Sequence, residues 1–77
     1  MSSVIETHDL TLYGCPMHYI KAREILRVLM LEESVLFEVN NGDAVDEVIN
    51  SLRHDGQSCG VESIEGPATL IRVVKNV

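Results

Sequence analysis

The chain has few aromatic residues and few basic ones. It contains no tryptophan, two tyrosines and one phenylalanine among 77 residues, so it lacks the interleaved aromatic residues that stack on nucleic-acid bases. Acidic residues outnumber basic ones by 12 to 6, which gives a net charge of −6. A negatively charged domain does not attract nucleic-acid phosphates, so we expect no direct nucleic-acid partner. The same charge suits docking onto a basic patch of a protein partner.

The sequence also lacks the signals of several other classes of protein. No apolar run approaches the roughly 20 residues that a membrane span needs. Residues 1–8 have neither the basic nor the apolar segment of a signal peptide. We therefore expect a cytoplasmic location and no membrane partner. The sequence has no glycine-rich phosphate loop and no Ser/His/Asp pattern, and we expect no cofactor.

The stretch Gly14-Cys15-Pro16-Met17-His18 stands out among what is present. Proline is favoured at the first position of a helix, which would place Cys15 at the N-cap. Free backbone N–H groups and the helix dipole there favour a thiolate over a thiol. The sequence thus predicts a reactive sulfur at a helix tip, with Pro16 fixing its direction. A buried structural thiol is the alternative, because free cysteines are often buried.

Hydrophobic periodicity places the regular elements. Alternating apolar residues predict strands at 9–13, 34–39, 59–64 and 69–75, and apolar stripes with helical spacing predict helices at 16–31 and 44–55. Asp43 is the expected N-cap of the second helix and Gly56 its C′ residue. The residues expected to be buried are Leu10, Leu12, Ile25, Leu29, Val35, Phe37, Val48, Ile49 and Leu52.

The order of these elements, β-α-β-α-β-β, defines the fold class. It predicts an α+β, two-layer sandwich in which two helices cover one face of a four-stranded mixed sheet. The last two strands are separated by a short turn and should form a hairpin. We expect a disordered N-terminal segment at 1–8, one domain at 9–77, and a monomer.

Four further residues are candidates for a functional role. His18 follows Cys15 by three residues and could exchange a proton with the sulfur, or it could be an exposed residue of the first turn. A local basic cluster is formed by Lys21, Arg23 and Arg27. It could guide an acidic partner, or it could be a solvated helix face.

Cysteine and histidine spacing does not predict a metal site. Cys15 and His18 have metal-ligand spacing, but no second clustered pair exists, and we expect no metal. The two cysteines of a leaderless chain are expected to be free thiols rather than a disulfide. Cys59 could be a core residue or a second thiol.

The chain resembles the TusA/SirA-like sulfur-carrier family. The resemblance rests on Cys15-Pro16 after a short strand and Gly14, and on the early basic residues Lys21 and Arg23. It spans about residues 9–75. The family signature is Cys-Pro-X-Pro, and this chain has Cys-Pro-Met-His, with His18 in place of the second proline.

The resemblance implies a sulfurtransferase-type carrier rather than a stand-alone catalyst. Cys15 would accept sulfane sulfur as a persulfide from a donor protein such as a cysteine desulfurase or a rhodanese-like enzyme. It would pass the sulfur to an acceptor protein in tRNA thiolation, cofactor synthesis or sulfur oxidation. Two alternatives remain open: a thiol-redox or regulatory module that uses Cys15 with Cys59, and a binding domain with no chemistry at Cys15.

Overall fold

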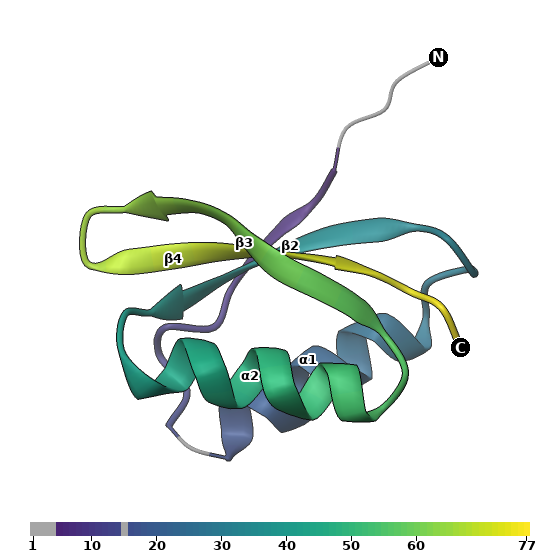
Figure 1. Cartoon of the computed structure of the whole chain (residues 1–77), viewed down its shortest axis with the longest axis horizontal. Helices are drawn as coiled ribbons and strands as arrows, with labels where there is room; N and C mark the ends of the chain where they lie inside the picture. The colour runs from purple at the N-terminus through teal and green to yellow at the C-terminus, as the bar shows by residue number, and fades with distance from the viewer. Residues whose placement is uncertain (1–4, 15) are drawn as a thin grey trace.

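Two helices pack side by side on one face of a four-stranded mixed sheet (Figure 1). The computed structural model describes residues 5–14 and 16–77. The elements follow in the order β1 (Thr7–Asp9), α1 (Met17–Arg27), β2 (Ser34–Asn40), α2 (Asp43–His54), β3 (Ser58–Glu65) and β4 (Ala68–Val74). The predicted α+β class, element order and one-sided helical layer are confirmed.

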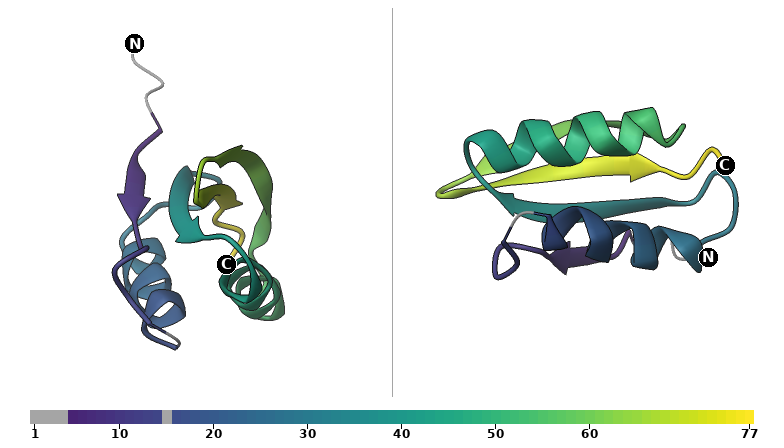
Figure 2. Two further views of the ribbon diagram at one scale, coloured as in Figure 1. Left: turned by 90° about the vertical axis from the view of Figure 1, so that its left-hand side faces the viewer. Right: turned by 90° about the horizontal axis from the view of Figure 1, so that it is seen from below.

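The sheet order is β1-β2-β4-β3. Strand β1 pairs with β2 in parallel, whereas β4 is antiparallel to both β2 and β3. Strand β3 is therefore parallel to β2, and the helices that connect β1 to β2 and β2 to β3 run in the same direction (Figure 2, right). As a result, the first turns of α1 and α2 lie at one end of the molecule and their last turns at the other.

The core lies between the sheet and the two helices. In β2, the alternating residues Val35, Phe37 and Val39 are buried, and α2 contributes Val48, Ile49 and Leu52. Leu10 is also buried, whereas Ile25 and Leu29 are half-buried against this core. The period of two in the strand and the helical spacing in α2 therefore predicted the inward faces of both elements correctly.

The first strand begins and ends earlier than predicted. It covers Thr7–Asp9 rather than 9–13, so the segment predicted to be disordered already contains strand residues. The carboxylate of Asp9 accepts a hydrogen bond of 2.8 Å from the backbone N–H of Thr11, which turns the chain after the strand. Beyond this turn the alternation no longer applies, and Leu12 is 90% exposed instead of buried.

The first helix is shorter than predicted, because it ends at Arg27 rather than at residue 31. Lys75, from the far end of the chain, donates its ammonium hydrogen bonds to the carbonyls of Arg27, at 3.3 Å, and Leu29, at 2.7 Å. Glu32 then adopts a positive φ of 72°. The predicted turn at Glu32 and Glu33 is confirmed, and backbone bonds between these two residues and Lys75 join it to the end of β4.

The second helix matches the prediction within one residue at each end. Gly42, with φ of 100°, is the N-cap, so Asp43 is the first helical residue and not the cap. Its negative charge still lies in the first turn, where the helix dipole favours it. Gly56, with φ of 102°, is the C′ residue as predicted.

Candidate functional site

The segment between β1 and α1 contains Cys15 in the sequence. Cys15 lies outside the described residues, but both of its neighbours are described. Gly14 and Pro16 are exposed, and among the described residues no heavy atom beyond Gly14 and its chain neighbours lies within 4 Å of the point where a Cβ on Gly14 would stand. The carbonyl of Gly14 accepts a hydrogen bond of 3.1 Å from the backbone N–H of His18. The residues on either side of Cys15 are thus open to solvent and tied to the first turn of α1.

This first turn differs from the prediction in its cap. Pro16 takes the N-cap position, with no side-chain cap, so Cys15 is not the N-cap residue. The backbone N–H of His18 donates to the carbonyl of Gly14. The backbone N–H of Tyr19 donates to the carbonyl of Pro16, also at 3.1 Å. Because carbonyl oxygens engage these donors, they are not free to stabilise a thiolate as the sequence led us to expect.

His18 is buried, so it is not the exposed first-turn residue that was one of its two interpretations. The residue is 3% exposed. Its Nδ1 accepts a hydrogen bond of 2.8 Å from the backbone N–H of Tyr19. Its Nε2 lies 3.5 Å from Oε1 of Glu47 on α2. Since α1 and α2 run in the same direction, the imidazole stands between the early turns of both helices. Sequence reasoning had no signal for Glu47, which is 29 positions away.

Exposed apolar side chains border the same turn. Leu12 and Tyr13 precede Gly14, and Met17 and Ile20 follow Pro16; all four are exposed. Apolar side chains gathered on a surface are typical of a site where another protein docks. We call these four residues the apolar rim. Of these four residues, the sequence had predicted burial for Leu12.

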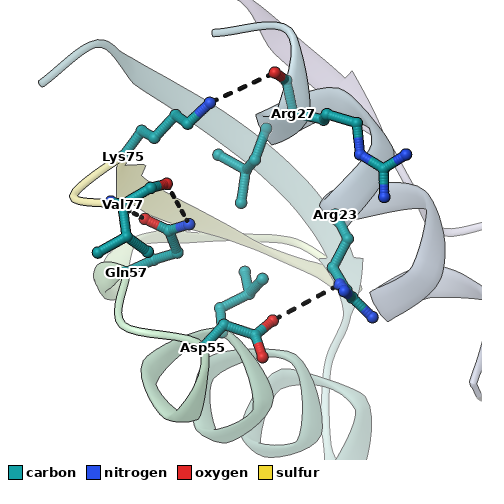
Figure 3. Close-up of a pocket in the computed structure, with 8 residues that line it drawn as sticks. Arg23, Arg27, Asp55, Gln57, Lys75 and Val77 are labelled. Carbon is teal, nitrogen blue, oxygen red and sulfur yellow. Dashed lines mark hydrogen bonds and ion pairs between the residues drawn. The ribbon is translucent and has the colours of Figure 1, made fainter. Parts of the chain in front are cut away.

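The basic cluster predicted on α1 is divided between two surfaces. Arg23 and Arg27 line a pocket of about 330 Å³ between the C-terminal ends of the helices, together with Lys75 and Asp55 (Figure 3). Lys21 does not line this pocket, and its ammonium group lies 3.6 Å from the carboxylate of Glu24. Lys75 joins the site through the packing of the last strand, which the sequence alone could not indicate. We refer to this site as the basic pocket.

One side of the basic pocket is fixed by contacts between the helices. The hydroxyl of Tyr19 donates a hydrogen bond of 2.6 Å to the carboxylate of Asp55, and the guanidinium of Arg23 lies 3.8 Å from the same carboxylate. The hydrogen bond to Asp55 raises the pKa of Tyr19 above its ordinary value. Arg23 also stacks over the Tyr19 ring, 5.6 Å from its centroid. Arg23 therefore has a structural role, whereas Arg27 lies beyond these contacts.

Cys59 lies on β3, at the end of the molecule where the helices finish. Its thiol is half-buried and donates to the carbonyl of Ile49 at 3.4 Å. Burial raises the pKa of Cys59 above its ordinary value, and the nearby Arg53 offsets only part of that effect. A half-buried thiol with a raised pKa is a poor nucleophile. The structure thus favours the core interpretation of Cys59.

Cys59 should therefore react slowly in the folded protein. A raised pKa leaves a smaller thiolate fraction at a given pH, and we expect alkylation about tenfold slower than in denatured protein. The measurement is the rate of iodoacetamide labelling in a Cys15→Ser variant, with and without guanidinium. Equal rates in the two states would mean that Cys59 is accessible and reactive, and would favour the two-thiol module.

Two other kinds of site are absent from the described residues. No group of three His, Cys, Asp or Glu side chains within residues 5–14 and 16–77 is arranged to hold a metal ion. None of the helices in this part of the chain is both long and apolar enough to cross a membrane.

Comparison with solved structures gives one informative match. The crystal structure of a SirA-like protein from Desulfitobacterium hafniense superposes with a TM-score of 0.78, covering 95% of this chain and 100% of that one. The fold is that of a SirA-like protein. The two sequences are 16% identical. The match therefore establishes the SirA-like fold, and it does not establish the activity. No protein-family model matches the sequence, and neither does any curated protein.

Proposed function

We propose that this protein is a cytoplasmic sulfur carrier that takes up a sulfane sulfur on Cys15 and passes it to an acceptor protein. The observation that carries the proposal is the position of Gly14 and Pro16. Both are exposed at the N-terminal end of α1 on a SirA-like fold. A cysteine between two such residues can be reached by the active site of another protein. Pro16 is the helix-positioning residue of this turn.

The chemistry is a thiol exchange. The Cys15 thiolate attacks the outer sulfur of a persulfide on a donor such as a cysteine desulfurase or a rhodanese-like enzyme. A new S–S bond forms on Cys15 while the S–S bond of the donor breaks, and the donor leaves as a thiolate. The reverse exchange with an acceptor thiolate empties Cys15. No cofactor or metal takes part, and the protein acts as a carrier between two enzymes.

The position of Cys59 speaks against the two-thiol redox alternative. The carbonyl of Cys59 accepts hydrogen bonds from Arg53 in the last turn of α2, whereas the neighbours of Cys15 lie at the N-terminal end of α1. The helices are parallel, so these ends are separated by about the length of α1, which is roughly 16 Å for 11 residues. A disulfide needs Cα atoms within about 7 Å.

Incubation with a cysteine desulfurase and cysteine tests the proposal. Intact-mass spectrometry under non-reducing conditions should show a species heavier by one sulfur atom. A species lighter by two hydrogen atoms would instead indicate the intramolecular disulfide of the redox alternative. An unchanged mass under conditions that load a known carrier would contradict the proposal.

We propose that the donor docks on the apolar rim, at the start of α1, and on the basic pocket, at the end of α1. Within residues 5–14 and 16–77, no carboxylate lies within 4.0 Å of the Arg27 guanidinium, whereas Arg23 and Lys21 each have one. Arg27 is therefore the cation of the α1 cluster that is most available to an acidic partner surface.

Arg27→Glu should weaken donor binding by about three- to tenfold at low ionic strength, since it replaces attraction with repulsion at the rim of the interface. The measurement is the dissociation constant for the desulfurase, determined by calorimetry at two salt concentrations. Lys21→Glu is the matched control, because it makes the same change of charge on α1 outside the basic pocket. A larger loss from Lys21→Glu than from Arg27→Glu would show that the basic pocket is not the docking surface.

A further inference from the structure

The sheet has an open edge along β3. The order β1-β2-β4-β3 places β3 at the margin of the sheet, and with eight residues it is the longest of the strands. Strand β4 pairs with one side of β3, and within residues 5–14 and 16–77 no backbone group pairs with the other side. On this outer side, Arg53 donates to the carbonyl of Cys59. Successive residues of an antiparallel strand direct their backbone groups to alternate sides, so the N–H and C=O of Val61 also point outward.

Two large apolar side chains of β3 are exposed. Val61 is 55% exposed and Ile64 is 71% exposed. Their neighbours across the ladder on β4, Ile71 and Thr69, are both buried. Val61 and Ile64 thus lie at the margin of the covered part of the sheet. An unpaired strand edge that carries exposed apolar side chains is a surface on which another strand can pair.

Gly60, between Cys59 and Val61, is not required by the folding of its own chain. Its φ is not positive, unlike those of Gly42, Gly56 and Gly66. Among the described residues, no heavy atom beyond Gly60 and its chain neighbours lies within 4 Å of the point where a Cβ would stand. A glycine inside a strand weakens that strand, and it often marks a place where another backbone or a ligand approaches closely. The open space over Gly60 therefore suits a docking strand.

Two features limit which strands can pair at this edge. Glu62 and Glu65 place negative charge along β3, and the register of the ladder shifts between Val61 and Ser63. Charged residues and bulges of this kind protect a sheet edge from unspecific pairing. A strand that docks here must therefore leave room for the side chain of Glu62 and bring a cation near it.

A second copy of β3 meets both requirements. When Val61 lies opposite Val61 of an antiparallel second copy, Glu62 of each copy lies opposite Gly60 of the other. Arg72 is the neighbour of Gly60 on β4, so it stands two strand spacings, about 9.6 Å, from Glu62 of the other copy. Because Gly60 has no side chain, the long side chain of Arg72 can cross this space. Within one copy, Arg72 Nη1 already lies 4.0 Å from Glu62 Oε1, so the pairing surrounds each guanidinium with two carboxylates.

We propose that two copies of this chain associate through antiparallel pairing of their β3 strands, with Val61 at the two-fold axis. The two four-stranded sheets then form one continuous sheet, and the same surface of both copies makes the contact. Strand β1, which precedes Gly14, lies at the opposite edge of the sheet from β3 (Figure 2, left). Gly14 and Pro16 therefore stay open in the dimer. The proposal goes beyond the carrier function, does not depend on it, and differs from the monomer expected from the sequence.

The test is sedimentation equilibrium of the full chain over a wide range of protein concentrations. Physiological salt, with a Debye length of about 8 Å, screens the repulsion between two copies of net charge −6. We expect a monomer–dimer equilibrium that Val61→Lys weakens by about tenfold or more, because it brings two ammonium groups together at the axis. Leu12→Lys is the matched control, since it makes the same kind of change at a residue that is 90% exposed on the apolar rim.

Charge reversal tests the register independently of Val61. Glu62→Arg should weaken the dimer by about three- to tenfold, because it turns two attractive pairs with Arg72 into repulsive ones. The double variant Glu62→Arg/Arg72→Glu should restore the parent dissociation constant. Both side chains are about half-exposed, at 44% and 45%, so all variants should keep the circular dichroism of the parent.

The outcomes separate the proposal from its alternatives. A concentration-dependent dimer that Val61→Lys and Glu62→Arg weaken, and that the double variant restores, supports it. A single monomeric species at every concentration overturns it. A dimer that survives Val61→Lys and is lost with Leu12→Lys also overturns it, and would place the contact on the apolar rim. A dimer that the double variant fails to restore overturns the proposed register.

Discussion

Replacing Cys15 with serine should abolish sulfur loading, whereas Cys59→Ser should leave most of it. A serine hydroxyl cannot form a persulfide, and the carrier reaction uses a single thiol. Cys59 has a raised pKa, and its thiol donates to the carbonyl of Ile49 in the middle of α2. The measurement is the fraction of protein that gains one sulfur atom from a desulfurase and cysteine, determined by intact-mass spectrometry for both variants side by side.

The Cys59→Ser variant also serves as the control for lost structure. Both substitutions replace a sulfur atom with an oxygen atom, and both variants should keep the helical signal of the parent in circular dichroism. If Cys59→Ser abolishes loading as fully as Cys15→Ser does while both variants stay folded, the reaction needs two thiols. The redox module would then replace the carrier.

Phe37→Ala should strongly destabilise the fold. Phe37 is fully buried at the centre of β2, opposite Ile71 of β4 and beside the ring of His8. Removing a buried phenyl ring typically costs about 3–5 kcal/mol, and in a domain of this size each kcal/mol lowers Tm by about 4–8 °C. We therefore expect Tm to fall by more than about 12 °C. Thermal denaturation followed by circular dichroism measures it.

Ile64→Ala is the matched control for this substitution. Ile64 is a large apolar residue in the same sheet, but it is 71% exposed. Truncation of an exposed side chain usually changes stability by no more than about 0.5 kcal/mol. Similar losses for Phe37→Ala and Ile64→Ala would mean that the core does not lie between the sheet and the helices.

The regular elements could be predicted where one repeating pattern decides the structure. The alternation of Val35, Phe37 and Val39 and the helical spacing of Val48 and Leu52 identify faces that are buried in the folded chain. In these segments local preference and tertiary packing agree. The same patterns gave the element order and therefore the two-layer architecture.

The errors arise where contacts from distant parts of the sequence or side-chain turns override the pattern. Leu12 continues the alternation of the first strand, but the Asp9–Thr11 turn has already ended that strand. The apolar residues after Arg27 continue the stripe of α1, but Lys75 caps the helix there. In each case the residue that ends the element is polar and leaves the hydrophobic pattern unchanged.

The candidate site was predictable only in part. The stretch from Gly14 to His18 draws attention through its cysteine and proline, and its neighbours prove to be exposed at the start of α1. The burial of His18 beside Glu47 depends on the parallel packing of two helices. The basic pocket depends on Lys75, which the hairpin of β3 and β4 brings back to α1. No local sequence pattern could indicate the contact between His18 and Glu47 or the presence of Lys75 in the basic pocket.

Peptide mapping of the sulfur-loaded protein tests the carrier hypothesis most directly. Trypsin separates the two thiols, because Lys21 is the first basic residue after Cys15, and Cys59 lies between Arg53 and Arg72. After loading by a desulfurase and trapping with iodoacetamide, the added sulfur should appear on the fragment that ends at Lys21 and disappear when an acceptor thiol is added. Sulfur found on the fragment with Cys59, or on neither fragment, would contradict the account.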